Sequence, residues 1–126
     1  MVLAVAGIAA ATYAGLASNA VAAPPTAVVE MTNDLRFTPD TVRIALGGSV
    51  EWRNTSDLVH TVTADPKKAI EPEHVQLPSG VAAFDSGNLG PGARFTRAFD
   101  VLGTYRYFCV PHEVAGMVGT VIVSVR

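Results

Sequence analysis

Apolar and polar residues alternate along this chain between glycine and proline turns, and this pattern restricts the fold more than any other feature. A period of two is that of a β-strand with one buried face. Glycine-rich turns such as Gly47-Gly48 and the cluster GNLGPG at 87–92 separate the alternating segments. The segments are Thr41–Leu46, Val50–Arg53, His60–Thr63, Arg94–Phe99, Thr104–Cys109 and Gly119–Val125.

These short segments predict an all-β fold rather than a helical one. We expect an antiparallel β-sandwich with Greek-key connections and about seven or eight strands. The stretch 65–80 is the long irregular connection, because Pro66, Pro72 and Pro78 disfavour ladder pairing. A short helical turn is compatible with residues 66–73. The length of 126 residues suits one domain with a single core.

The first 23 residues carry no charged side chain and are predicted to lie outside the folded domain. Their apolar body and the small residues Ala20-Val21-Ala22 are typical of a secretory signal peptide. A membrane anchor is the alternative, since roughly 20 apolar residues can span a bilayer. We therefore expect residues 1–23 to be a signal peptide or a membrane tether, and residues 24–126 to form an exported domain.

The charge of the chain argues against a nucleic-acid partner. The formal net charge is −2, and every charged side chain follows residue 29. Binding to a nucleic acid requires a basic patch or stripe. The adjacent pair Lys67-Lys68 is followed closely by Glu71 and Glu73, which is typical of a solvated loop.

The only cysteine stands in the run Cys109-x2-His112-x4-Met117. Alternation places Tyr105, Tyr107 and Cys109 on the inward face of their strand, and it places Phe108 on the outward face. An exported chain with one cysteine cannot form an internal disulfide, so the thiol needs protection. Either plain burial or a bound metal would provide it.

His60 begins another alternating segment that a sandwich can bring beside Cys109. With His112 and Met117 the set then holds a thiolate, two imidazoles and a thioether, which selects copper and suits both Cu(I) and Cu(II). Zinc is the rival, but its set of Cys109, His60, His112 and His74 would leave Met117 unexplained. We predict one copper ion bound by His60, Cys109, His112 and Met117. His74 is expected to be a surface loop residue.

The segment YRYFCVPHEVAGMVGTVIV resembles the metal-binding loop of the cupredoxins, the plastocyanin-like small blue (type 1) copper proteins. Further matches are Phe37-x-Pro39, Val50-x-Trp52-x-Asn54 and Phe84-x-Ser86-Gly87, so that the resemblance covers nearly all of residues 28–126. It implies a cupredoxin-like sandwich and the ligand set named above. It also implies that Asn54, Thr61 and Pro111 hold the ligand residues in position without binding the metal themselves.

Several positions depart from the family pattern. Thr61 stands where asparagine is usual. Its backbone N–H is still expected to reach the Cys109 sulfur, whereas the side-chain link between the two ligand loops is at risk. Glu113 brings a carboxylate next to His112, which is expected to lower the reduction potential modestly. Val59 and Val114 stand where proline and glycine are common.

The resemblance also implies how the protein works. We expect a monomeric one-electron carrier, not an enzyme, that docks transiently with larger redox proteins. A chain with three histidines has too few for additional copper sites. Copper delivery is the alternative function. The periplasm, the cell exterior and the thylakoid lumen are the candidate compartments.

The expected docking surface consists of apolar residues around the edge of His112, although ordinary loop packing would explain them as well. Its members are Leu58, Val59, Phe108, Val114 and Ala115.

Overall fold

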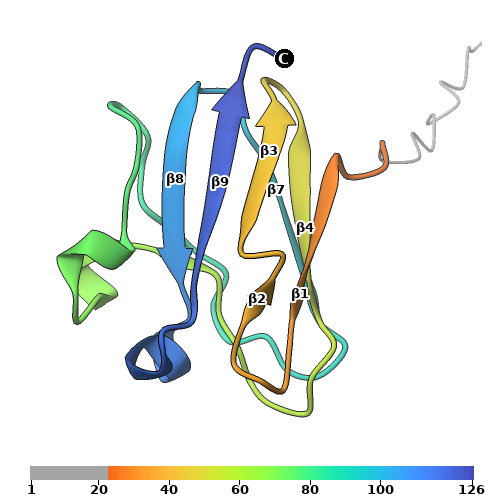
Figure 1. Ribbon diagram of the computed structural model, residues 1–126, viewed down its shortest axis with the longest axis vertical. Coiled ribbons are helices and arrows are strands. Elements are labelled where there is room, and N and C mark those ends of the chain that lie inside the picture. Colours follow the sequence, from red (N-terminus) through yellow and green to blue (C-terminus); the bar gives the residue numbers. More distant parts are fainter. Residues whose placement is uncertain (1–22) are drawn as a thin grey trace, which may run out of the picture.

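The computed structural model describes residues 23–126, and the leader predicted for residues 1–23 lies outside this range except for Ala23. The described chain is built from strands and short 3-10 turns (Figure 1). The strands are β1 (Ala27–Met31), β2 (Phe37–Thr38), β3 (Thr41–Ala45), β4 (Ser49–Asn54), β5 (Thr63–Ala64), β6 (Phe84–Asp85), β7 (Arg94–Ala98), β8 (Gly103–Phe108) and β9 (Val118–Ser124). The turns are η1 (Pro66–Lys68), η2 (Pro72–His74) and η3 (Val110–Ala115).

The strands form the two sheets of a sandwich, as predicted. One sheet has the order β2-β1-β4-β7 and the other has the order β3-β9-β8-β5-β6. Most neighbours are antiparallel, but β1 pairs with β4 and β3 pairs with β9 in parallel, a detail that the alternation does not specify. The strand expected over His60–Thr63 is shorter, since only Thr63 belongs to β5 and His60 forms an isolated bridge with Leu89.

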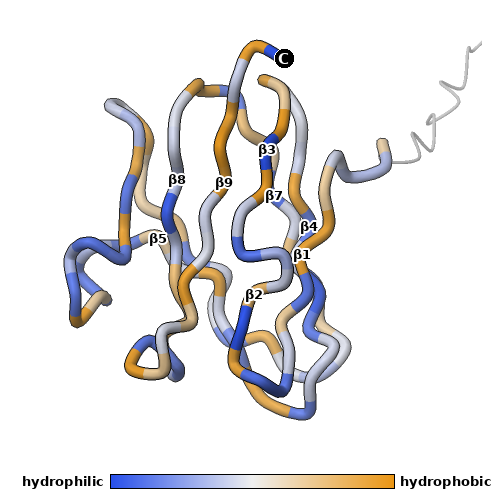
Figure 2. Tube along the Cα trace, viewed as in Figure 1, coloured by the Kyte–Doolittle hydropathy of each residue, from blue (hydrophilic) through white to orange (hydrophobic). Residues whose placement is uncertain are grey.

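Alternate residues of the strands enter the space between the sheets. In β4 the side chains of Val50, Trp52 and Asn54 are buried while their neighbours are half-exposed. The same period of two runs through β9, where Val121 and Val123 point inward. Figure 2 shows that apolar and polar stretches follow one another along the chain. Burial of these apolar faces holds the two sheets together.

Aromatic side chains occupy the middle of the core. The ring of Trp52 meets Tyr107 edge-on at 5.2 Å between centroids, and Phe37 meets the other side of Tyr107 at 4.7 Å. These are favourable edge-to-face contacts. Gly119 of β9 is required here, because a Cβ at this position would lie 2.3 Å from the Tyr107 ring. Trp52, Phe37 and Phe99 are core residues, and Phe95 is half-buried against the core.

The connection over 65–80 contains the turns η1 and η2 and folds against the five-stranded sheet. Gln76 pairs with Arg106 of β8 through two backbone hydrogen bonds, of 2.8 and 3.2 Å. Phe108, which alternation places on the outward face of β8, is nevertheless 0% exposed. The expectation that Phe108 is a surface aromatic available to partners is wrong. Alternation specifies which face a residue occupies, but not whether another segment covers that face.

Among residues 23–126 no helix is both long enough and apolar enough to cross a membrane. In Figure 1 the turn η3 lies at the lower end of the sandwich and the C-terminus lies at the upper end.

Candidate metal centre

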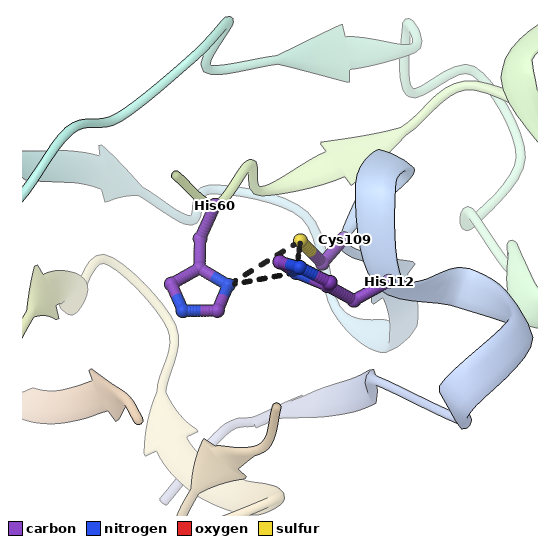
Figure 3. A group of neighbouring side chains, drawn as sticks. All are labelled: His60, Cys109 and His112. Carbon is purple, nitrogen blue, oxygen red and sulfur yellow. Dashed lines mark hydrogen bonds between the residues drawn. The ribbon is translucent and has the colours of Figure 1, made fainter. Parts of the chain in front are cut away.

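Three donor atoms converge at the end of the sandwich where β8 leads into η3 (Figure 3). The Sγ of Cys109 lies 3.6 Å from Nδ1 of His60 and 3.4 Å from Nδ1 of His112. The two Nδ1 atoms are 3.2 Å apart. Residues separated by 49 positions in the sequence, His60 and Cys109, thus present donors to a common point.

The loop before His60 is held by the buried amide of Asn54. Its Nδ2 donates to the carbonyls of Leu58, at 2.7 Å, and Leu89, at 2.9 Å. Its Oδ1 accepts from the backbone and the hydroxyl of Ser56. Leu89 in turn exchanges two backbone hydrogen bonds with His60. Asn54 therefore holds the backbone that carries His60, consistent with its expected supporting role.

The second loop is a compact turn that returns the chain to its starting point. Pro111 stands at the first helical positions of η3, where its fixed φ favours the turn that carries His112. Gly116 ends η3 with φ of 82°, a left-handed conformation that glycine adopts without strain. Met117 then accepts a hydrogen bond from the N–H of Cys109 at 3.1 Å, so both ends of the loop meet.

Met117 is fully buried in the core cluster together with Cys109. Its backbone N–H donates to the carbonyl of His112 at 3.3 Å. The donor atoms of His60, Cys109 and His112 therefore lie close together. The backbone of Met117 is hydrogen-bonded to the backbones of Cys109 and His112. Its thioether as a ligand remains a prediction.

The protonation states suit metal binding. Burial and the neighbouring His112 lower the pKa of His60, and the backbone of Thr32 opposes this shift. A neutral imidazole is the form that binds metals. Burial raises the pKa of the Cys109 thiol, while the backbone N–H groups of Thr61 and His112 and the side chain of Thr61 oppose that rise. A buried thiol of this kind ionises readily only beside a cation.

The geometry and chemistry of the donors fit copper. The edges of the triangle, 3.2 to 3.6 Å, match the separations around one ion with metal–nitrogen bonds of about 2.0 Å and metal–sulfur bonds of about 2.3 Å. Two imidazoles and a thiolate, with a methionine at hand, form the donor set of blue copper sites. His74 does not join them within residues 23–126.

Thr61 links the two ligand loops in two ways. Its backbone N–H donates to the Cys109 sulfur at 3.4 Å, as expected. Its hydroxyl accepts the N–H of Val110 at 2.8 Å. The side-chain link that seemed at risk without asparagine is therefore present, because the threonine oxygen reaches the same loop.

Glu113 and His74 form a buried connection that the sequence analysis missed. The Glu113 carboxylate accepts the backbone N–H groups of Ile70 and Glu71 at 2.9 to 3.1 Å. It also lies 2.8 Å from Nδ1 of His74. The carboxylate thus joins η3 to the long connection instead of facing His112. A carboxylate following the metal-binding histidine was visible in the sequence, but its partners were not.

Replacing Glu113 by glutamine is expected to destabilise the metal-free protein by about 2 kcal/mol at pH 7, because an amide NH2 would face backbone donors. Burial raises the pKa of Glu113, but its hydrogen bonds outweigh burial and lower the pKa below 4.5. The stabilisation is therefore present above pH 4.5 and is lost as the pH falls through the lowered value. Urea unfolding of both proteins across this range measures the difference.

The matched control is Glu73→Gln, because Glu73 is an exposed carboxylate in η2. It should change the free energy of unfolding by no more than about 0.5 kcal/mol at any of these pH values. A difference between wild type and Glu113→Gln that persists unchanged into acid would contradict the role assigned to the ionised carboxylate.

Exposed apolar residues belong to the two loops that carry His60 and the half-buried His112. Leu58 is 39% exposed, Val59 44% and Val114 90%, and Ala115 is also exposed. Val110, 41% exposed, belongs to the same loop and was not expected to be part of the surface. Phe108 is absent from this surface because it is fully buried.

Comparison with known proteins places this geometry among copper proteins. The profile of the family described as copper binding proteins, plastocyanin/azurin family, matches residues 25–124. The chloroplastic plastocyanin of Tetradesmus obliquus is 40% identical over 94 residues, which cover 71% of this chain and 59% of that protein. The chloroplastic plastocyanin of Pisum sativum is 33% identical over 129 residues, covering 95% of this chain and 70% of that protein.

A solved structure has the same fold. The purple cupredoxin from Nitrosopumilus maritimus superposes with a TM-score of 0.60 at 26% sequence identity. The superposition covers 78% of this chain and 99% of that one.

Proposed function

Because the chain belongs to the plastocyanin/azurin family of copper-binding proteins, we propose that it is a one-electron carrier with a single type 1 copper ion. The observation that supports this most directly is the convergence of His60 Nδ1, Cys109 Sγ and His112 Nδ1 within 3.2 to 3.6 Å. Copper, when bound, supplies a couple between Cu(I) and Cu(II).

The residues around the donors restrict how far these donors can move. The amide of Asn54 is hydrogen-bonded to the backbone of Leu89, which pairs with His60. Thr61 is hydrogen-bonded to Cys109 and Val110 in the loop that carries Cys109 and His112. Donors held in this way keep nearly one arrangement in both oxidation states. A small rearrangement favours rapid electron transfer. Met117 is proposed as the weak fourth ligand because it is buried and closes the same loop.

An electron carrier is a better fit than an enzyme. Of the three histidines in the chain, two belong to the donor set and His74 is engaged with Glu113. No histidine is therefore left for a second copper site of the kind that copper oxidases need. Copper delivery is less compatible with the site, because Cys109 and His60 are fully buried and would release the metal slowly.

Export is part of the proposal. The uncharged first 23 residues are proposed to be a leader that directs residues 24–126 out of the cytosol. Relatives such as the Pisum sativum protein carry the description chloroplastic. The thylakoid lumen, the periplasm and the cell exterior are all compatible with a chain of this composition.

Copper titration tests the function. The purified protein given Cu(II) should turn intensely blue through a thiolate-to-copper absorption band, and it should bleach reversibly with one electron per protein. Zinc serves as the comparison metal. A colourless copper complex would favour copper delivery, and preferential tetrahedral zinc binding would favour a structural site.

We propose that redox partners dock on the apolar surface around His112, formed by Leu58, Val59, Val110, Val114 and Ala115. His112 is half-buried whereas His60 and Cys109 are fully buried, so the His112 ring is the donor that we propose as the path for the electron. Weak, brief association of this kind uses small and largely apolar contacts.

Val114→Asp is expected to slow electron self-exchange between reduced and oxidised copies by about tenfold, because two like charges would meet in the encounter. The blue band and the potential should not change. Self-exchange is measured by NMR line broadening in mixtures of the two redox forms. The control is Val125→Asp, since Val125 is 74% exposed and follows β9 near the C-terminus, at the opposite end from η3. Equal slowing by both variants would argue against docking at this surface.

A further inference from the structure

The end of the sandwich away from the metal centre is closed by turns that are hydrogen-bonded to one another. After β3, the N–H of Leu46 donates to the carbonyl of Ser124 in β9 at 2.7 Å. The N–H of Gly47 donates to the carbonyl of Phe99, in the connection from β7 to β8, at 2.8 Å. β8 begins at this end and leads through Cys109 into η3 at the other end (Figure 1). This distal end consists of residues 23–26, 46–48, 99–102 and 125–126.

Apolar side chains are exposed at the distal end, and few charges accompany them. Leu46 is 46% exposed, Val101 37%, Leu102 45% and Val125 74%. The four segments of this end carry one acidic and one basic side chain, whose charges cancel. Exposed apolar patches mark contacts with proteins or membranes. The distal end is therefore a contact surface without net charge.

The uncharged first 23 residues join the domain at this same end. Thr26 is fixed to the start of β4, because its N–H donates to the carbonyl of Ser49 at 2.8 Å and its Oγ1 accepts the N–H of Ser49 at 3.1 Å. Only Pro24 and Pro25 lie between Ala23 and Thr26. The three steps from Ala23 to Thr26 span at most about 11 Å, and prolines stiffen them. A surface that holds the leader therefore holds the distal end close to it.

We propose that residues 1–23 are retained as a membrane anchor and that the distal end rests on a neutral lipid bilayer, with the metal centre facing away from the lipid. An uncharged apolar segment of this length is long enough to cross a bilayer. The inference rests on the proposed export and adds that the leader is not removed. It does not depend on the bound metal.

The anchor makes a weak contact sufficient. A few apolar side chains by themselves hold a domain on lipid only weakly and reversibly. Joined to an anchor through two prolines, the same side chains meet the bilayer at a high effective concentration, so the contact needs no large area. Leu46, Val101, Leu102 and Val125 are the side chains that enter the interface.

The short link also decides between the two exposed apolar surfaces of the domain. The surface around His112 lies at the far end of β4, a strand of six residues and about 20 Å in length. This length exceeds the reach of the link, about 11 Å. Laying the sandwich on its side would place charged residues of the strands, such as Glu30 and Arg43, against lipid. The surface around His112 therefore remains in water, where redox partners can reach it.

Tryptophan quenching in vesicles tests the orientation. The full chain with Leu102→Trp is placed in phosphatidylcholine vesicles with and without bromine on the acyl chains, because bromine quenches tryptophans that reach those chains. The emission of Leu102→Trp should be strongly quenched. Val114→Trp, at the metal end, is the matched control and should not be quenched. Trp52 is 0% exposed and adds the same background to both variants.

Leu102→Asp tests the apolar contact itself, with Val125→Trp as the reporter. The ratio of docked to undocked domains should fall about tenfold, because apolar burial is lost and a carboxylate resists leaving water. The quenched fraction of the reporter gives this ratio, and circular dichroism checks the fold. Val59→Asp, at the metal end, is the control and should leave the ratio unchanged.

Equal quenching of Leu102→Trp and Val114→Trp, or quenching of neither, would overturn the proposed orientation. An exported protein whose N-terminus lies near residue 24 by mass spectrometry would overturn the retained anchor. A dimer in detergent that Leu102→Asp dissociates would assign the distal end to a second copy instead of lipid. None of these results bears on the electron-carrier function, which the copper titration tests separately.

Discussion

Cys109→Ser is expected to abolish the intense visible absorption of the copper-loaded protein completely. The band requires a thiolate that shares electron density with Cu(II), and Cys109 is the only cysteine of the chain. A serine hydroxyl at this buried position is a poor ligand for copper and stays protonated. Visible absorption and electron paramagnetic resonance after addition of Cu(II) measure the loss.

The fold should survive this change with a cost of about 1 to 3 kcal/mol, because a buried hydroxyl replaces a thiol. Circular dichroism of the metal-free variant checks that the sandwich is intact. His74→Gln is the matched control: His74 is engaged with Glu113 rather than with the donor set, so its variant should remain blue. Retention of the band by Cys109→Ser would refute the thiolate site.

Met117→Leu is expected to retain copper and to raise the reduction potential. The thioether is a weak donor, and its removal destabilises Cu(II) more than Cu(I). Leucine has nearly the volume of methionine, so the free energy of unfolding should change by less than about 1.5 kcal/mol. Voltammetry of the copper-loaded variant measures the potential, and denaturant unfolding of the metal-free variant measures the stability.

Met31→Leu is the control for this experiment. Met31 of β1 is as deeply buried as Met117, but it does not belong to the predicted donor set. Its replacement should leave the potential unchanged. An unchanged potential in Met117→Leu would show that Met117 is not an axial ligand, and equal shifts in both variants would point to general loosening of the core.

The strands and the inward face of β8 could be predicted from the sequence because alternation is a local property. The burial of Tyr105, Tyr107 and Cys109 follows directly from their spacing in a strand. Phe108 shows the limit of this reasoning. It does not belong to the core cluster between the sheets, yet it is 0% exposed, and no local pattern reports which distant residues bury a side chain.

Some of the hydrogen bonds around the metal centre could likewise be predicted from the sequence, and others could not. The hydrogen bond from the backbone N–H of Thr61 to the Cys109 sulfur could be expected. The backbone N–H is present at this position whether the side chain is asparagine or threonine. The hydrogen bonds that join Thr61 to Thr63 and Thr63 to Asp85 could not be expected, because Thr63 and Asp85 belong to β5 and β6, whose pairing only the folded chain establishes. The contact of Glu113 with Ile70 and His74 is of the same kind.

The sequence by itself determined the class of fold and the chemistry of the site. Period-two alternation makes strands, and a thiolate, an imidazole and a thioether in one short segment, with a second histidine elsewhere in the chain, favour copper. Only the tertiary structure decided that Phe108 is buried, that the Thr61 hydroxyl accepts the N–H of Val110, and which apolar residues remain exposed. These features depend on contacts between segments far apart in the chain, and such contacts form only when the sheets pack.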